Sequence, residues 1–207
     1  QFILFFEEKW NNGSIEAIKR INNGFIERKQ RKYPEAKLRL RTGVYKVEKD
    51  CDGASFAIDA ANYARRQIQD NSPETVCVYD KTMADLQNME NEIAIGLDKA
   101  IKNKEFKIYL QPRFSLTTGK IVGAESLVRW QREDGTILPP DSFIPVYEKN
   151  GRIIDLDFYM FEETVKLLAN WKEQGIPQRL ISINASALHA QNSDTVHRYT
   201  TILEKYG

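Results

Sequence analysis

Strand-like and helix-like segments alternate along the second half of this sequence, and this alternation constrains the fold more than any single motif. Strand-like apolar runs occupy residues 106–110, 121–130 and 180–184. Apolar residues at helical spacing occupy residues 143–148, 155–173 and 196–206, the first of these helices capped by Asp141 or Ser142. Such alternation is typical of an α/β fold with parallel strands. The first two strand-like runs are expected to form a hairpin or an adjacent pair.

The first 80 residues contain a smaller set of the same signals. Residues 1–6 are apolar and strand-like and begin without a preceding turn, as if the chain were entered within a domain. Ser14 is a candidate cap for a helix that Pro34 closes. A strand with alternating polarity at residues 38–45, a helix at residues 55–69 and a short strand at residues 76–79 follow. This segment is therefore also predicted to be α/β.

Residues 81–102 form one long amphipathic pattern between these two regions. Apolar residues recur at steps of three and four, from Met83 to Ile101. The pattern predicts a helix of about six turns, which suits a connection between two domains. An ordinary packing helix is equally compatible with the spacing. The change of pattern on either side favours the linker.

The charges of the chain are balanced, with 30 Lys plus Arg against 29 Asp plus Glu and a formal net charge of +1. This balance gives no overall attraction to a nucleic acid polymer or an anionic membrane. No apolar run approaches the length of a membrane span. Cys51 and Cys77 are far apart and are interpreted as reduced thiols. We expect a cytoplasmic segment, with any anchor to the inner membrane supplied by an upstream sensor.

Two charged residues interrupt the apolar run at residues 121–130. A period of two places Glu125, Leu127 and Arg129 on one face of the strand, with the charged ends about 13 Å apart. One interpretation is an edge strand with one solvated face. The other is a carboxylate metal ligand, with an arginine farther along the strand toward the end where α/β sheets place their sites.

Asn184 ends the strand-like run at residues 180–184. An amide oxygen and the Glu125 carboxylate, from neighbouring strand ends, are hard ligands that suit Mg²⁺ or Mn²⁺ better than Zn²⁺. An asparagine at a strand end is also a common turn or cap residue. His189 and His197 have no second histidine or cysteine at ligand spacing, and no role is predicted for them.

Four separated motifs resemble the EAL phosphodiesterase family in order and spacing over residues 106–207. They are Tyr109-Leu110-Gln111-Pro112, then Gly123-Ala124-Glu125-Ser126-Leu127-Val128-Arg129-Trp130, then Phe143-Ile144-Pro145 with Glu148, Gly151 and Leu156-Asp157, then Ile183-Asn184-Ala185-Ser186. Upstream, the chain resembles the latter part of a degenerate GGDEF domain, in Gln1-Phe2, in Thr42-Gly43-Val44 and in Ala61-Asn62-Tyr63 with Arg66. The expected organisation is a GGDEF-like part at 1–80, a linker helix at 81–102 and an EAL-like part at 103–207.

The resemblance implies a cyclic di-GMP phosphodiesterase on a TIM-like (β/α) barrel, which opens the cyclic dinucleotide to linear pGpG with Mg²⁺ or Mn²⁺. It implies that Glu125 and Asn184 are metal ligands, that Arg129 contacts a substrate phosphate, and that Gln111 and Leu127 lie at the nucleotide site. It also implies cyclic di-GMP as the partner ligand and a homodimer through the EAL domain.

The sequence departs from the family pattern at three points. Ser126 replaces the usual alanine, which we expect to be tolerated, and Gln1 stands where the GGDEF signature has glutamate, which predicts no cyclic di-GMP synthesis. The later acidic ligands and the lysine of the family are expected beyond Gly207. The 207-residue chain alone is therefore expected to be inert, and its open barrel covered by a partner, a second copy or further sequence. The alternatives to an enzyme are an inactive cyclic di-GMP receptor and a regulatory or interaction module.

Overall fold

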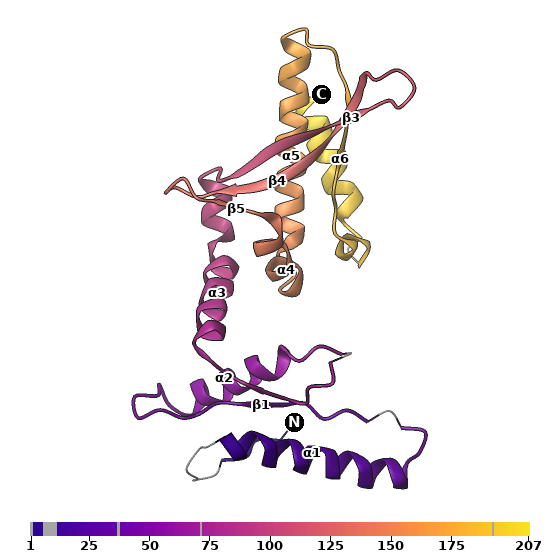
Figure 1. Cartoon of the computed structure of the whole chain (residues 1–207). Coiled ribbons are helices and arrows are strands. Elements are labelled where there is room, and N and C mark those ends of the chain that lie inside the picture. Colours follow the sequence, from indigo (N-terminus) through magenta and orange to yellow (C-terminus); the bar gives the residue numbers. More distant parts are fainter. Residues whose placement is uncertain (1, 6–11, 37, 71, 192) are drawn as a thin grey trace. The chain divides into compact units, whose positions relative to one another are not determined.

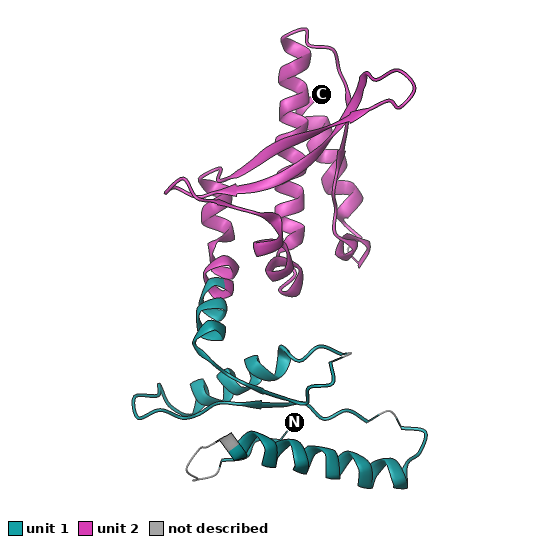
Figure 2. Cartoon of the chain, in the orientation of Figure 1, with its two compact units in different colours: residues 1–89 teal, residues 90–207 magenta. Residues whose placement is uncertain are grey.

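The structure is a computed structural model that describes residues 2–5, 12–36, 38–70, 72–191 and 193–207. Two compact units make up the chain, Gln1–Met89 and Glu90–Gly207 (Figure 2). The boundary between them falls inside α3 (Lys81–Lys102). The long helix predicted at residues 81–102 is thus confirmed as an element, and its role as a linker between two family domains stays a prediction. Among the described residues, no helix is long and apolar enough to cross a membrane.

Unit 1 contains a strand–helix–strand arrangement. Its elements are α1 (Asn12–Lys32), β1 (Thr42–Val44), α2 (Ala54–Arg66) and β2 (Val76–Val78). Strands β1 and β2 pair in parallel, so α2 is the crossover between them (Figure 1). Gly43 of β1 is packed so closely against α2 that a Cβ atom there would lie 1.8 Å from the Ala61 carbonyl oxygen. Glycine is therefore required for this contact.

Three local predictions for unit 1 were wrong. Phe2–Phe5 form no strand and are exposed, and Gln1 and Phe6 lie outside the described residues. Because α1 already begins at Asn12, Ser14 is inside the helix and is not its cap. The predicted strand at residues 38–45 is reduced to the three residues of β1, since only these pair with β2.

The sheet of unit 2 is built around one long strand. It comprises β3 (Phe106–Phe114), β4 (Ile121–Gln131), β5 (Ile137–Leu138) and β6 (Leu180–Ile183). The predicted hairpin is confirmed, because β3 and β4 pair antiparallel over their length. On its other edge β4 pairs with β5 antiparallel and with β6 parallel (Figure 1). The interpretation of residues 121–130 as an edge strand is therefore wrong, and the sheet is mixed.

Four helical segments follow the hairpin: α4 (Pro140–Lys149), α5 (Ile153–Glu173), the short 3-10 helix η1 (Ala187–Gln191) and α6 (Thr195–Tyr206). The cap predicted at Asp141 or Ser142 is wrong. Pro139 precedes α4 in an extended conformation and Pro140 occupies its first turn, a position where proline loses no hydrogen bond.

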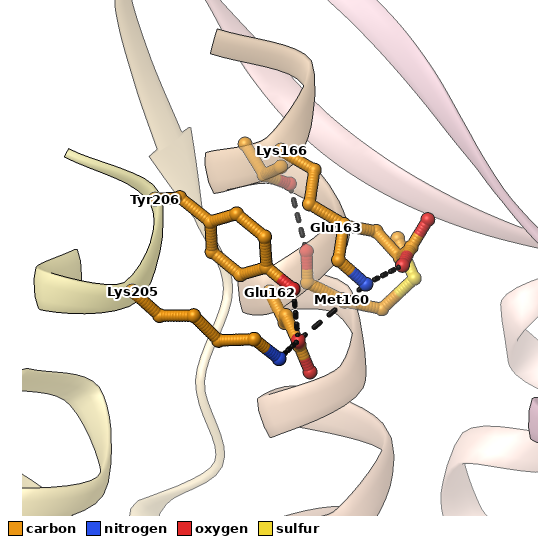
Figure 3. Close-up of polar contacts among 7 residues, drawn as sticks. Met160, Glu162, Glu163, Lys166, Lys205 and Tyr206 are labelled. Atoms are coloured by element: carbon orange, nitrogen blue, oxygen red, sulfur yellow. Dashed lines mark hydrogen bonds and ion pairs between the residues drawn. The ribbon is translucent and has the colours of Figure 1, made fainter. Parts of the chain in front are cut away.

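Helix α6 is held against α5 by a polar cluster around Glu162 (Figure 3). One oxygen of the Glu162 carboxylate accepts hydrogen bonds from Tyr206 Oη at 2.6 Å and Lys205 Nζ at 2.9 Å. Lys166 Nζ lies 3.5 Å from the same oxygen. The hydrogen bond from Tyr206, followed by those positive charges, lowers the pKa of Glu162 to about 2. This carboxylate is therefore ionised at any ordinary working pH.

The helices cover one face of the unit 2 sheet. Phe106 and Trp130 are register partners on β3 and β4 and are both buried. Their rings lie 5.8 and 5.7 Å from that of Phe143 on α4, and Trp130 also contacts Tyr147. Because side chains alternate across a strand, the odd-numbered residues of β3 and β4 point to the opposite face. The helices therefore bury the even-numbered side chains Phe106 and Trp130, and the odd-numbered side chains lie on the face of the hairpin that α4 does not cover.

Replacing Phe143 tests this core. Phe143→Ala removes a fully buried ring at the centre of the aromatic cluster. We expect the free energy of unfolding from urea denaturation to fall by about 3–5 kcal/mol. Phe114→Ala is the matched control, because Phe114 is 56% exposed and its loss should cost less than about 0.5 kcal/mol. Equal losses for the two variants would show that the helices do not pack on this face.

Candidate functional site

Glu125 and Asn184 are brought together although 59 residues separate them. In the parallel pairing of β4 and β6, Glu125 is the register partner of Ser182, and Asn184 lies two residues beyond Ser182 on the same face. Asn184 Nδ2 donates a hydrogen bond of 2.9 Å to Glu125 Oε1. The two candidate ligands therefore lie within hydrogen-bond distance of each other. Glu125 is not at a strand end, because β4 is long and continues past the end of the short β6.

A second donor to this carboxylate is Arg113, which sequence reasoning missed. Arg113 Nη2 lies 3.4 Å from Glu125 Oε2. The hydrogen bond from Asn184, then the one from Arg113, lowers the pKa of Glu125 below its ordinary value. The signal in the sequence is the period of two, which places Arg113 on the same face of β3 as Gln111. The ionised form of Glu125 is therefore stabilised, in part by the positive charge of Arg113.

Gln111 and Leu127 flank Glu125 on the open face of the sheet. Gln111 is the register partner of Glu125 across the antiparallel pair and is exposed. Side chains of such partners lie about 5 Å apart at their Cβ atoms. Leu127, half-buried, faces Tyr109 in the same way. An amide and an apolar contact therefore lie on either side of the carboxylate.

Arg129 lies on the same face but farther along β4. Its Nη1 donates to the Val128 carbonyl oxygen at 2.8 Å, and its guanidinium lies 5.5 Å from the centre of the Tyr109 ring. Its register partner is the exposed Lys107, which the sequence reasoning did not single out. Two cations therefore lie opposite each other at this end of the hairpin, a pattern that attracts phosphate.

The donors on this face suit a hard divalent cation. Glu125 offers carboxylate oxygens, and a half-turn of the Asn184 amide would offer its carbonyl oxygen toward the same space. Oxygen donors suit Mg²⁺ and Mn²⁺, and Mg²⁺ commonly uses one or two carboxylates together with water and phosphate oxygens. Within the described ranges, no group of three or more His, Cys, Asp or Glu gathers to hold a metal. The pair thus fits as part of a metal site.

Two residues outside the predicted set, Asp157 and His189, contact each other beside the segment that follows Asn184. His189, to which no role was assigned, is buried, with its Nε2 3.0 Å from Asp157 Oδ2. Burial raises the pKa of the Asp157 carboxyl. Asp157 had appeared in the sequence only as part of the Leu156-Asp157 motif. Their pairing is not visible in the sequence because it joins a helix to the turn after β6.

The fold and the site define a mixed α/β domain, helix-covered on one face, with an oxygen-donor site and cations on the other. The sequence model of the EAL domain matches residues 96–207, which is just over half of the chain. The chain belongs to the EAL domain family.

Several known proteins are similar to this chain. The probable cyclic di-GMP phosphodiesterase PdeB of Escherichia coli is 42% identical over 88 residues, which are 42% of this chain and 17% of that protein. The structure of the PaMucR phosphodiesterase in complex with c-di-GMP has a TM-score of 0.51 at 23% identity, over 56% of this chain and 47% of that one. The apo structure of the S helix-GGDEF-EAL part of Vibrio cholerae LapD has a TM-score of 0.50 at 17% identity. The match covers 94% of this chain and 45% of that one.

Both structural similarities concern the fold alone, since the identities are low. The chain spans about a fifth of the length of the curated relatives that it matches, for example 21% and 18% of the first two.

The electrostatics of Glu125 can be measured directly. Asn184→Leu removes the larger of the two stabilising hydrogen bonds, so we expect the pKa of Glu125 to rise toward its ordinary value. Arg113→Gln should raise it by less. The measurement is a carboxyl ¹³C NMR titration of the chain without metal. Asn103→Leu, which removes an amide donor to Glu133 at 2.8 Å, is the control and should leave the Glu125 titration unchanged. An unchanged midpoint in Asn184→Leu would contradict the geometry.

Proposed function

We propose that the protein acts in cyclic di-GMP signalling as a metal-dependent phosphodiesterase that converts cyclic di-GMP to linear pGpG. The observation that carries this proposal is the Glu125–Asn184 pair on the open face of the sheet. Membership of the EAL domain family and the relative PdeB, named as a probable cyclic di-GMP phosphodiesterase, support the choice of substrate.

Each residue on the open face has a role in this proposal. Glu125 and Asn184 would hold Mg²⁺ or Mn²⁺, which when bound neutralises a phosphodiester and acidifies an attacking water. Arg129 offers a planar fork of donors to a phosphate oxygen. Gln111 would hydrogen-bond to the nucleotide, and Leu127 would contact it through its apolar side chain. Each of these side chains is exposed or half-buried and so can reach a ligand.

Arg113 adds a further contact to the candidate site. Its guanidinium pairs with the same carboxylate that would hold the metal. Because it is half-exposed, this ion pair is weak and can be exchanged for a divalent cation at small cost. Arg113 thus keeps Glu125 neutralised and oriented in the absence of metal.

The serine in the Glu125-Ser126-Leu127 motif does not face the site. Ser126 is buried on the helix-covered face, where its Oγ lies 3.2 Å from Thr164 Oγ1 on α5. Thr164 Oγ1 itself donates to the Met160 carbonyl oxygen at 2.8 Å. The hydroxyl is therefore accommodated behind the sheet, and the departure from the family pattern leaves the ligand face unchanged.

Ser126→Ala tests this point. It removes one of two hydrogen bonds available to Thr164 and leaves the open face intact. We expect the rate of pGpG formation by the full-length protein to stay within about twofold of the parent rate, with a stability loss of about 1 kcal/mol. A large loss of rate without a matching loss of stability would mean that the hydroxyl acts in the site.

The arrangement of the rest of the protein is also proposed. Unit 1 is the latter part of a degenerate GGDEF domain that regulates the phosphodiesterase through α3. In its support, Thr42-Gly43-Val44 forms β1 and Ala61-Asn62-Tyr63 lies on α2. The fold similarity to a GGDEF-EAL protein extends over 94% of this chain. Gln1 of the signature lies outside the described residues. A cytoplasmic location and a homodimer through the EAL domain complete the proposal.

A second candidate function is a receptor that binds cyclic di-GMP without hydrolysing it. The observation behind it is the Arg113–Glu125 contact, because a guanidinium beside this carboxylate competes with a metal ion for it. Calorimetry with cyclic di-GMP, beside an assay of pGpG formation, separates the two functions. Binding without turnover would favour the receptor, and an absence of binding would eliminate both.

Glu125→Gln in the full-length protein tests the enzyme directly. The amide keeps the size of the side chain but loses the charge that holds a divalent ion, so we expect pGpG formation with Mg²⁺ or Mn²⁺ to fall by more than about 100-fold. Glu204→Gln, an exposed change on α6, is the control and should retain the parent rate. A fully active Glu125→Gln variant would refute the proposed site.

A further inference from the structure

The carboxylate of Asp157 contacts two residues of the segment that follows β6, Ser186 and His189. Asp157 on α5 accepts a hydrogen bond of 2.8 Å from the backbone N–H of Ser186 at its Oδ2. The same oxygen lies 3.0 Å from His189 Nε2. The side chains of Asp157 and His189 are only 13% and 8% exposed. Asp157 Oδ2 therefore links both Ser186 and His189 to α5.

The surroundings of His189 define which of its nitrogens carries a proton. Its Nδ1 is buried and has no partner among the described residues. An ionised carboxylate can only accept, so Nε2 is the nitrogen that carries hydrogen in the contact with Asp157. Phe158 and Tyr199 pack against the ring at centroid distances of 5.0 and 5.7 Å.

Asn184 lies between two fixed points of the backbone. On one side, Ser182 and Ile183 are held by pairing with Glu125 and Ser126 of β4. On the other side, Ser186 is held by Asp157. Only Asn184 and Ala185 lie between these points. The direction in which the Asn184 amide leaves the backbone is therefore set from both sides.

We propose that Asp157, supported by His189, is a positioning residue that directs the Asn184 amide toward Glu125 and so shapes the metal site. Its consequence for metal binding rests on the proposed function. Groups that orient metal ligands from behind typically contribute 10–100-fold to affinity or activity. A carboxylate that only stabilised the turn would affect unfolding and leave the ligand geometry unchanged.

The first experiment needs no metal and no substrate. In the ¹⁵N-labelled chain, the Ser186 amide should exchange with solvent at least about tenfold more slowly than an unprotected amide, because it bonds to a buried carboxylate. In Asp157→Leu this protection should disappear. The heteronuclear NOE of the Asn184 side-chain amide should fall, because that amide becomes more mobile. Asp157→Asn keeps an acceptor oxygen and should restore both signals.

A matched control removes a similar contact elsewhere in unit 2. Asp134 accepts a hydrogen bond of 2.8 Å from the Thr136 backbone N–H in the turn between β4 and β5. Asp134→Leu should leave the Asn184 and Ser186 signals unchanged. An unprotected Ser186 amide in the parent chain would overturn the proposal, even if Asp157→Leu failed to fold.

The second experiment uses the full-length protein. In Asp157→Leu, the Mn²⁺ concentration for half-maximal pGpG formation should rise on the order of tenfold, and Asp157→Asn should return it to within about twofold of the parent. An unchanged Mn²⁺ dependence in an active Asp157→Leu protein would overturn the role in metal binding. If the NMR result holds and the parent protein forms no pGpG, the positioning role stands and the proposed function falls.

Discussion

The parallel pairing of β6 with β4 is the interaction on which the candidate site depends. It is the contact that places Asn184 beside Glu125, and it covers only four register pairs. Gly123, at the first of these pairs, has no room for a side chain, because a Cβ atom would lie 2.5 Å from the Leu180 carbonyl oxygen. The close approach of the two strands thus requires glycine at one end, and the Asn184–Glu125 hydrogen bond lies beyond the other.

The two faces of the β3–β4 hairpin have different roles: one packs against helices and the other carries the candidate site. Even-numbered residues such as Phe106, Ser126 and Trp130 pack against α4 and α5 and supply stability. Odd-numbered residues such as Gln111 and Glu125 carry the polar groups on the other face. Because the period of a strand is two, a substitution on one face leaves the other largely unaffected. The serine beside the candidate metal ligand illustrates this separation.

Much of the fold was predictable from periodicity, since long amphipathic helices such as α3 and α5 have a strong spacing signal. Glu125 could be singled out from the sequence because a charged residue in an apolar run requires an explanation, whereas Asn184 alone could equally have been a turn or cap residue. Helix starts were predicted poorly, because a proline before α4 served in place of a polar cap. Partnerships such as Arg113 with Glu125 and Asp157 with His189 were not predictable, because each joins separate elements through a register or packing that single-sequence patterns do not contain.

The long β3–β4 hairpin also bears on the order in which the domain assembles. Its strands are neighbours in the chain, so the entropy lost in closing their turn is small, whereas β6 must return to β4 after α4 and α5 have intervened. Folding that starts from local contacts would form the hairpin early and add β6 late. In a folding chain, Glu125 would thus be in place on the hairpin before Asn184. The two residues would come into contact only when β6 pairs with β4.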